Sequence, residues 1–280
     1  MLPTNFSQQL GRGIECGPIS SMEEENEESL FLMPRRVPRG LFVTGTDTAV
    51  GKTWIAAALA RLLAERNLIV RPRKPVESGC RWEGDRLLPA DARTLQAASG
   101  TDDPLERICP HPLEAALSPE RAASLAGATL TLVDLCAACL DGVAETDFLL
   151  VEGAGGFYSP LAADVLNADL ATALPLPVLL VAADRLGTIG QTLLAVEAIK
   201  RRGLALVGVV LNRIDAPTDP LMDNGADLSH WLGRPVIVTE RSDAGAVAPD
   251  GTPRCPALAS LVDRLAVGFR PARNEARNHR

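Results

Sequence analysis

Short apolar runs alternate with longer segments of mixed character from Leu41 onward. The run Phe148–Glu152 (FLLVE) is apolar up to its closing carboxylate, which is typical of a strand buried on both faces of a sheet. Such strands, separated by helical segments, predict a mostly parallel sheet covered by helices. The expected strands are Leu41–Thr44, Ile69–Lys74, Phe148–Glu152, Pro177–Ala182, Leu206–Leu211 and Pro235–Val238.

Between these strands, alanine and leucine recur at the spacing of one face of a helix. The chain is therefore expected to have an α/β fold. No internal repeat and no linker rich in Pro or Gly divides this part of the chain, so we expect one domain. The expected helices are Thr53–Glu65, Asp91–Ala98, Thr131–Ala144, Gln191–Arg201 and Pro256–Ala266.

The two ends of the chain differ from this central part. Residues 1–38 carry the acidic run Glu23–Glu28 and lack the apolar centre of a signal peptide, so a disordered tail is expected, with Met33 as an alternative start. The domain is expected to span residues 39–268. Residues 269–280 are polar and basic and are expected to form a frayed tail.

Composition excludes several classes of protein. The net charge of −7 leaves no surplus of Lys and Arg to neutralise nucleic-acid phosphates, and the 4% of aromatic residues makes base-stacking platforms improbable. No apolar run is long enough to span a bilayer. These features favour an enzyme of the cytoplasm that binds neither nucleic acid nor membrane.

Six cysteines are spread along the chain without the spacing of a disulfide scaffold, and we interpret them as reduced thiols. Cys136 and Cys139 form a C-x-x-C inside the run LCAACL, with no second ligand pair nearby. Two small core residues of a helix are the favoured interpretation. A metal or redox site is the alternative.

The segment Gly45–Thr53 (GTDTAVGKT) lies between the first expected strand and the first expected helix. Backbone N–H groups of such a loop cradle phosphate oxygens, and the positive end of the following helix adds to the attraction. Lys52 would reach the β- and γ-phosphates, and the Thr53 hydroxyl would bind Mg²⁺. The loop predicts a nucleotide site in a three-layer α/β/α P-loop NTPase fold.

This loop departs from the usual G-x-x-x-x-G-K-[ST] pattern at its start, because Thr46 holds the first-glycine position and Gly45 comes one residue too early. The position four residues before Gly51 is Asp47. ATPases that partition plasmids or position division sites carry lysine there, so Asp47 argues against those relatives.

Three further segments accompany the loop: KPVESG at Lys74–Gly79, PADA with Asp91, and VEGAGG at Val151–Gly156. Together with GTDTxVGKT, in this order and at this spacing, they resemble the dethiobiotin synthetases. The resemblance extends from Leu41 to near Val267. It rests chiefly on the combination of these motifs, since either KPVxSG or VEGAGG alone would be weak evidence.

The resemblance implies a magnesium site and two catalytic lysines. Thr53, Asp91 and Glu152 would hold Mg²⁺ on ATP, in keeping with the preference of this ion for oxygen ligands. Lys74 matches the family's active-site lysine. It would act with Lys52, and both are compact point charges suited to phosphate and carbamate oxygens.

The resemblance also implies contacts with the substrate and with ATP. Thr48, Ser78 and Ser118 match substrate-binding positions, and Asn212 matches the residue that hydrogen-bonds the adenine. The implied ATP-binding positions are Thr48, Ala49, Val50, Gly51, Lys52, Thr53, Trp54, Asp91, Glu152, Gly153, Ala154, Gly155, Asn212 and Arg213.

Four of the implied site residues also have a simpler interpretation. Lys74 before Pro75 could be a solvated strand end, and Glu152 could be a structural carboxylate. Asp91 could be the N-cap of the helix it begins, since Pro-Ala-Asp is a good entry signal. Ser118 precedes Pro119, and Ser-Pro is frequent at helix starts.

Several positions differ from the family pattern. The loop position that is usually acidic is Ala49, and the common Asn-His of the later helix is replaced by Gly190-Gln191. Asn212 is followed by Arg213 instead of an acidic residue, and Pro235–Glu240 (PVIVTE) replaces a G-x-I-P turn. The residues expected to bind phosphate and metal are thus retained. The positions expected to recognise the nucleotide base and the tail of the substrate differ from the family pattern.

The family's reaction closes the ureido ring of dethiobiotin from 7,8-diaminopelargonate, CO₂ and ATP. An amine of the substrate attacks CO₂, so no protein nucleophile is needed, and the enzyme gathers and neutralises anionic groups. The resemblance further implies a homodimer with a shared site. The alternatives are an amidoligase-type synthetase, such as the ATP-binding half of corrinoid a,c-diamide synthesis, and a non-catalytic nucleotide switch.

Overall fold

The computed structural model describes residues 39–214, 219, 221–239, 251 and 253–267, all within one compact unit. Its centre is a six-stranded sheet in the order β12-β11-β10-β1-β7-β2, and every neighbouring pair in it is parallel. The strands are β1 (Gly40–Gly45), β2 (Val70–Arg73), β7 (Phe148–Gly156), β10 (Val178–Ala183), β11 (Leu206–Asn212) and β12 (Ile237–Val238).

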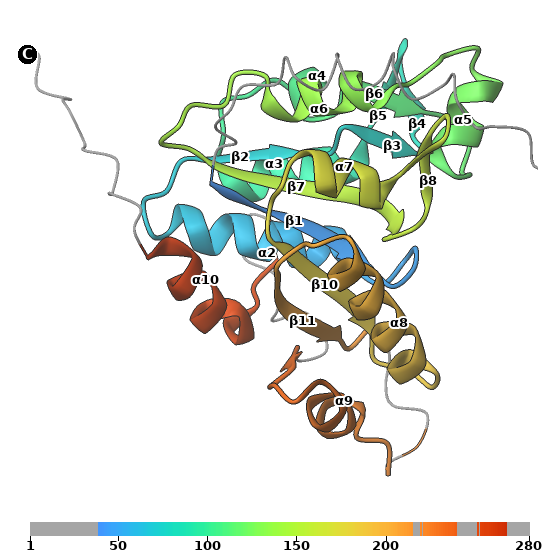
Figure 1. Cartoon of the computed structure of the whole chain (residues 1–280). Helices are drawn as coiled ribbons and strands as arrows, with labels where there is room; N and C mark the ends of the chain where they lie inside the picture. The colour runs from blue at the N-terminus through green and yellow to red at the C-terminus, as the bar shows by residue number, and fades with distance from the viewer. Residues whose placement is uncertain (1–38, 215–218, 220, 240–250, 252, 268–280) are drawn as a thin grey trace, which may run out of the picture. The chain divides into compact units, whose positions relative to one another are not determined.

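Helices cover both faces of the sheet, so the expected three-layer α/β/α fold is confirmed (Figure 1). On one face lie α2 (Lys52–Ala64), α3 (Ala90–Ser99) and α10 (Ala259–Ala266), the last entered through a 3-10 turn, Pro256–Leu258. On the other face α7 (Asn167–Ala173) packs on β7 and α8 (Thr188–Arg201) packs on β10 and β11. Beside them lie α6 (Leu132–Leu140) and α9 (Asn224–Leu232).

Alternate residues of each central strand serve the two faces. Leu41 and Val43 of β1 belong to the core beneath α2, together with Leu150 of β7 and Val181 of β10. The residues between them, such as Phe42, are equally buried on the opposite side. Because both faces are covered, the strands carry the continuous apolar runs from which they were predicted.

The sequence analysis did not anticipate the helices α7 and α9, nor several small elements around the strand ends. These small elements are α4 (Leu105–Ile108), the parallel pair β3 (Val76–Ser78) and β6 (His111–Leu113), and the antiparallel pairs β4 (Arg81–Glu83) with β5 (Arg86–Leu88) and β8 (Pro160–Ala162) with β9 (Val165–Leu166). The helix α5 (Pro119–Leu125) begins where Ser118-Pro119 allowed a helix start.

The boundaries of several predicted elements needed correction, and three of them are instructive. The strand β7 continues past Glu152 because it resumes pairing with β1 after an irregularity, with Gly156 opposite Gly45. The helix α6 ends at Leu140 instead of Ala144, since Asp141 leaves the helical region and Gly142 has a positive φ. The helix α8 begins at Thr188, three residues before the predicted start.

The two cysteines of the C-x-x-C motif, Cys136 and Cys139, are completely buried in α6, which confirms their interpretation as core residues. Burial raises the pKa of the Cys136 thiol to about 11, so the thiolate needed for metal or redox chemistry is disfavoured. The cysteines of the described residues are all free thiols.

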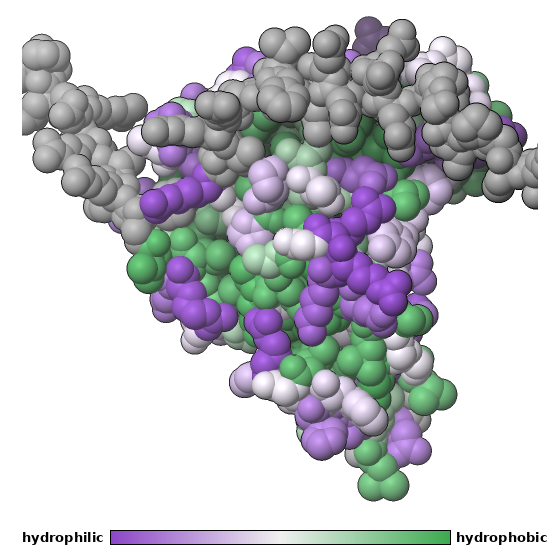
Figure 2. Space-filling model, in the orientation of Figure 1, coloured by the Kyte–Doolittle hydropathy of each residue, from purple (hydrophilic) through white to green (hydrophobic). Residues whose placement is uncertain are grey.

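On the face seen in Figure 2, apolar areas are interrupted by bands of polar side chains. Within the described part of the chain, no helix has the length and apolar character to cross a membrane. The predicted tails, residues 1–38 and 269–280, and the start at Met33 fall outside the described residues.

Candidate functional site

The loop between β1 and α2 lies at the carboxyl end of the sheet, where open α/β folds bind ligands. A Cβ atom on Gly45 would lie 2.9 Å from the main-chain oxygen of Asp47, so the turn requires glycine one residue earlier than the usual motif. Gly51 has a φ of 84° and begins α2, and a Cβ there would lie 2.0 Å from Asn212 Nδ2. Both loop glycines are therefore required by the fold.

Lys52 is buried and points back over the loop. Its Nζ donates to the main-chain oxygen of Asp47 at 2.9 Å. Burial, with a further contribution from nearby Lys74, lowers the pKa of Lys52 to about 8. The ammonium group is thus held at the mouth of the loop, where an anion would restore its usual pKa.

A second lysine is surrounded by oxygen atoms at the end of β7. Lys74 Nζ lies 2.6 Å from Glu152 Oε1 and 3.0 Å from Asp91 Oδ2, and Thr53 donates its hydroxyl to Glu152 Oε1 at 2.8 Å. Residues from β7, α2, α3 and the segment after β2 thus converge here. Three of them, Thr53, Asp91 and Glu152, are the residues that the sequence predicted to share one metal.

The charges of this cluster are strongly coupled. Burial alone would lower the pKa of Lys74, but the carboxylates of Glu152 and Asp91 outweigh it and raise the pKa. Burial would also raise the pKa of Asp91, yet Lys74 lowers it. Lys74 is almost completely buried, so it is not the solvated strand end of the simpler interpretation.

Glu77 belongs to the same cluster, and the sequence analysis missed it. Its two carboxylate oxygens accept the main-chain N–H groups of Asp91 and Ala92 at 3.0 and 3.1 Å. These N–H groups open α3, so Glu77 caps this helix from β3. The interpretation of Asp91 as N-cap was wrong, because the N-cap position is Pro89 and the capping carboxylate comes from elsewhere in the chain.

Asn167, at the start of α7, fixes the last residues of β7, which follow Glu152. Its Oδ1 accepts the N–H of Ala154 at 3.1 Å, and its Nδ2 donates to the main-chain oxygens of Ala154 and Gly156. Asn167 is fully buried. The predicted nucleotide-contact segment, Gly153–Gly155, is therefore held against the phosphate loop from the opposite face of the sheet.

Asn212 and Arg213 stand at the carboxyl end of β11. Asn212 Nδ2 donates to the main-chain oxygen of Val50 at 3.1 Å, and its Oδ1 accepts the hydroxyl of Thr239 at 3.0 Å. Arg213 Nε donates to Asp184 at 3.0 Å. The predicted adenine contact is thus joined directly to the phosphate loop, through partners that the sequence gave no means of identifying.

One polar cavity of about 260 Å³ brings most of these residues together. Several predicted positions do not line it: Val50, Trp54, Gly153, Asn212 and Arg213 lie outside it, and Ser118 occupies the N-cap position of α5. We call this space the phosphate cavity. It is lined by Thr48, Ala49, Gly51, Lys52, Thr53, Lys74, Glu77, Ser78, Asp91, Glu152, Ala154 and Gly155.

The chain is similar to known proteins over most of its length. The AAA domain family matches residues 39–245. An ATP-dependent dethiobiotin synthetase from Anaeromyxobacter dehalogenans is 46% identical over 197 residues, which are 70% of this chain and 86% of the relative. Another from Ralstonia nicotianae is 40% identical over 198 residues, or 71% and 86% of the two chains. This chain belongs to the dethiobiotin synthetase family.

Among solved structures, the septum site-determining protein MinD from Pyrococcus horikoshii, complexed with Mg-ADP, is 16% identical with a TM-score of 0.49. The alignment covers 82% of this chain and 94% of that protein.

Three further departures from the dethiobiotin synthetase pattern can be placed in the structure, the last of them in part. Ala49 lies on the phosphate loop with a φ of 56°, an uncommon conformation for a residue with a side chain. Gly190 and Gln191 lie in the first turns of α8, where both are exposed. Of the segment Pro235–Glu240, Ile237 and Val238 form β12, and Glu240 lies outside the described residues.

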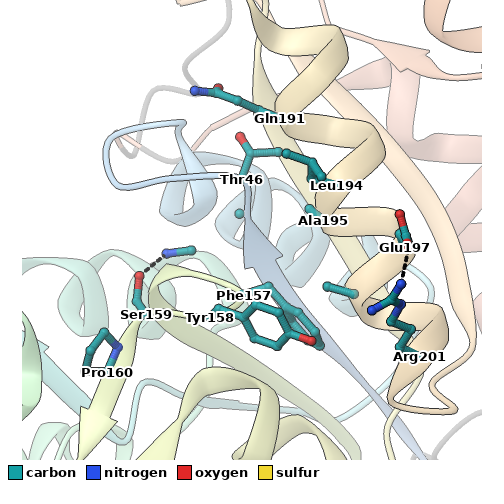
Figure 3. Close-up of a pocket in the computed structure, with 13 residues that line it drawn as sticks. Thr46, Phe157, Tyr158, Ser159, Pro160, Gln191, Leu194, Ala195, Glu197 and Arg201 are labelled. Carbon is teal, nitrogen blue, oxygen red and sulfur yellow. Dashed lines mark hydrogen bonds and ion pairs between the residues drawn. The ribbon is translucent and has the colours of Figure 1, made fainter. Parts of the chain in front are cut away.

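A second, larger cavity of about 780 Å³ adjoins the loop on the α8 side, and we call it the α8 cavity. Figure 3 shows Gln191 and Leu194 of α8 on one side and the rings of Phe157 and Tyr158 on the other. Gly45 and Thr46 also line it, so it begins where the phosphate loop leaves β1. Gln191, where this chain departs from the family pattern, therefore borders the α8 cavity next to the phosphate loop.

Proposed function

We propose that this chain catalyses ATP-dependent closure of the ureido ring of dethiobiotin, from 7,8-diaminopelargonate and CO₂, in biotin biosynthesis. The observation that carries the proposal is the cluster of Lys74, Glu152, Asp91 and Thr53 beside the phosphate loop, in a chain of this family. A switch protein needs a phosphate loop but has no use for a second buried lysine between two carboxylates.

The oxygen atoms of the cluster fit Mg²⁺. Glu152 Oε2 is buried without a hydrogen-bond partner, the Thr53 hydroxyl donates to the other oxygen of this glutamate, and the Asp91 carboxylate pairs with the same lysine, Lys74. Magnesium sites in phosphoryl-transfer enzymes combine one or two carboxylates with phosphate oxygens, so this donor set suits Mg²⁺ on ATP. When bound, the ion would neutralise developing charge on the phosphates.

We assign the two lysines to the two ends of the transferred phosphoryl group. Lys52 lies on the loop, where the β- and γ-phosphates would bind. Lys74 lines the same cavity as Ser78 and Thr48, where it would orient the carbamate oxygens. Both would stabilise charge that forms as the phosphoryl group moves.

The reaction needs no protein nucleophile. One amine of the diamine attacks CO₂ and forms a carbamate, ATP phosphorylates the carbamate oxygen, and the second amine displaces phosphate to close the ring. What the protein must supply, besides charge stabilisation, is alignment of the three reactants, which lowers the barrier because their freedom of motion is lost on binding.

We also propose that the chain works as a homodimer in which the α8 cavity receives part of the substrate or of the partner subunit. Leu194 of α8 is 70% exposed and Tyr158 is half exposed on the lining of this cavity, and Leu186, just before α8, is 85% exposed. Large apolar side chains gathered at the edge of a cavity are typical of surfaces that become buried on association.

The decisive experiment combines purified protein with ATP, Mg²⁺, ¹³C-labelled bicarbonate and diaminopelargonate, and detects dethiobiotin by mass. The expected product carries one ¹³C atom. ADP is expected in an amount equal to that of labelled dethiobiotin, and only when the diamine is present. ATP hydrolysis that does not depend on the diamine, with no labelled product, would exclude the ligase and favour the nucleotide switch. Sedimentation of the same sample tests the homodimer, which an active monomer would contradict.

A further inference from the structure

The start of α3 depends on a residue that is far from it in sequence. Pro89, at the N-cap position, offers no side-chain acceptor, and the helix has no capping hydrogen bond of its own. The N–H groups of the second and third residues, Asp91 and Ala92, are the ones that an N-cap side chain normally accepts. Glu77 accepts both, one with each oxygen.

This arrangement decides what the Asp91 side chain can do. An aspartate in the first turn of a helix readily bonds to nearby main-chain N–H groups. Here those groups are already occupied by Glu77, and the Asp91 carboxylate points to Lys74 instead, with Oδ2 3.0 Å from Nζ. The carboxylate is 40% exposed toward the phosphate cavity, so it is available to a bound cation as well.

Glu77 sits on a well-anchored segment. The strand β3 pairs with β6, where Glu77 lies opposite Pro112. The N–H of Gly79 donates to the main-chain oxygen of Ala115 at 3.2 Å. Cys80 Sγ donates to the main-chain oxygen of Glu77 at 3.3 Å. Since Lys74 directly precedes this segment, one stretch of chain sets the positions of both Lys74 and the start of α3.

We propose that Glu77 is a positioning residue that holds Asp91 in the geometry required for the metal-bound nucleotide. This role rests on the metal function of Asp91 proposed above. Without the cap, the first turn of α3 loses two hydrogen bonds, and the Asp91 carboxylate turns back to replace them. The site then loses an oxygen ligand even though no residue of the predicted metal set has been changed.

The test measures binding of a non-hydrolysable ATP analogue by calorimetry, with Mg²⁺ and again with excess EDTA. Glu77→Ala is expected to weaken the Mg²⁺-dependent affinity about tenfold, as loss of a residue that orients a metal ligand typically does, and to leave affinity in EDTA unchanged. Glu77→Gln keeps one carbonyl acceptor, so its Mg²⁺-dependent affinity should lie between those of the wild type and Glu77→Ala. Glu83→Ala, on the exposed neighbouring strand β4, is the matched control.

Asp91→Asn, alone and combined with Glu77→Ala, separates positioning from a general effect. If Glu77 acts through Asp91, the double variant binds the Mg²⁺ complex no more weakly than Asp91→Asn. A further tenfold loss in the double variant, or an equal loss in EDTA, would overturn the proposal. Should Glu77→Ala not fold, the same comparison with Glu77→Gln decides. The titration contains no diamine, so failure to form dethiobiotin would be a separate result.

Discussion

The two cavities that meet at the phosphate loop are built in different ways. The phosphate cavity is small, and buried charges with fixed partners line it: Lys74 with Glu152 and Asp91, and Glu77 with the start of α3. The α8 cavity is three times as large and is bordered by exposed apolar residues such as Leu194 and Tyr158.

From this difference we infer that the phosphate cavity serves catalysis and the α8 cavity serves recognition. Buried charges in fixed geometry stabilise a transition state without reorganising, whereas a wide, largely apolar space can accept a carbon chain or a partner surface in more than one form. Changes in the phosphate cavity should therefore reduce turnover, and changes in the α8 cavity should alter substrate affinity. The following predictions run from the largest expected effect to the smallest.

Replacement of Lys74 should have the largest effect. Lys74→Met removes the charge that compensates Glu152 and Asp91, and we expect turnover to fall about a thousandfold, as for loss of a group that stabilises transition-state charge. The chain has only three lysines among its 28 Lys and Arg residues, and the exposed third, Lys200, provides the matched control Lys200→Met. Circular dichroism checks the fold, and a Lys74 variant within tenfold of wild type would contradict the assignment.

Glu152→Gln should be the next most damaging change. It keeps the shape of the side chain but removes the charge shared by Lys74 and Thr53, and we expect turnover to fall about a hundredfold and to require more Mg²⁺. Glu65→Gln breaks an exposed ion pair with Arg61 and should have almost no effect. A Glu152 variant with an unchanged Mg²⁺ dependence would remove this residue from the metal site.

Asn212→Ala tests the proposed contact with the nucleotide base. It removes hydrogen bonds to the main-chain oxygen of Val50 and to Thr239. The expected result is an increase of about tenfold in the KM for ATP with little change in kcat, since one buried hydrogen-bonding group is worth about 1–2 kcal/mol. Ser229→Ala, which removes a hydroxyl bonded to Gly225 within α9, is the control. A loss of kcat alone would indicate a purely catalytic role for Asn212.

Gln191→Ala should have the smallest effect. Its side chain lies on the exposed edge of the α8 cavity, so we expect the KM for diaminopelargonate to rise about threefold while the KM for ATP stays constant. Steady-state kinetics with each substrate varied in turn provides the measurement. An increase confined to ATP would reverse the assignment of the two cavities.

The fold and the phosphate end of the site could be predicted because their signals are local. Buried parallel strands leave continuous apolar runs, and GTDTAVGKT, KPVESG and VEGAGG each place a charged or glycine residue at a strand end. One missed element also had a local signal, since Gly84-Asp85 between Arg81–Glu83 and Arg86–Leu88 is a typical two-residue hairpin turn.

Other features depend on contacts that no local pattern encodes. Glu77 caps a helix that begins after the β4–β5 hairpin, and Asn212 bonds to Val50, which is 162 positions away in the chain. The α8 cavity combines one face of a helix with the loop at Phe157 and Tyr158, and neither carries a motif. The sequence could therefore indicate the reacting groups but not the residues that hold them in place.

The contact between Gly51 and Asn212 limits how the nucleotide loop can be transplanted. A methyl group at Gly51 would collide with the Asn212 amide, and that amide also bonds to the adjacent residue of the loop. Asn212 is the last residue of β11, which lies two strands away from β1 in the sheet. Grafting the nine loop residues onto another sheet would thus require Asn212 to be moved with them. In protein engineering, the loop and this strand end form a single transferable part.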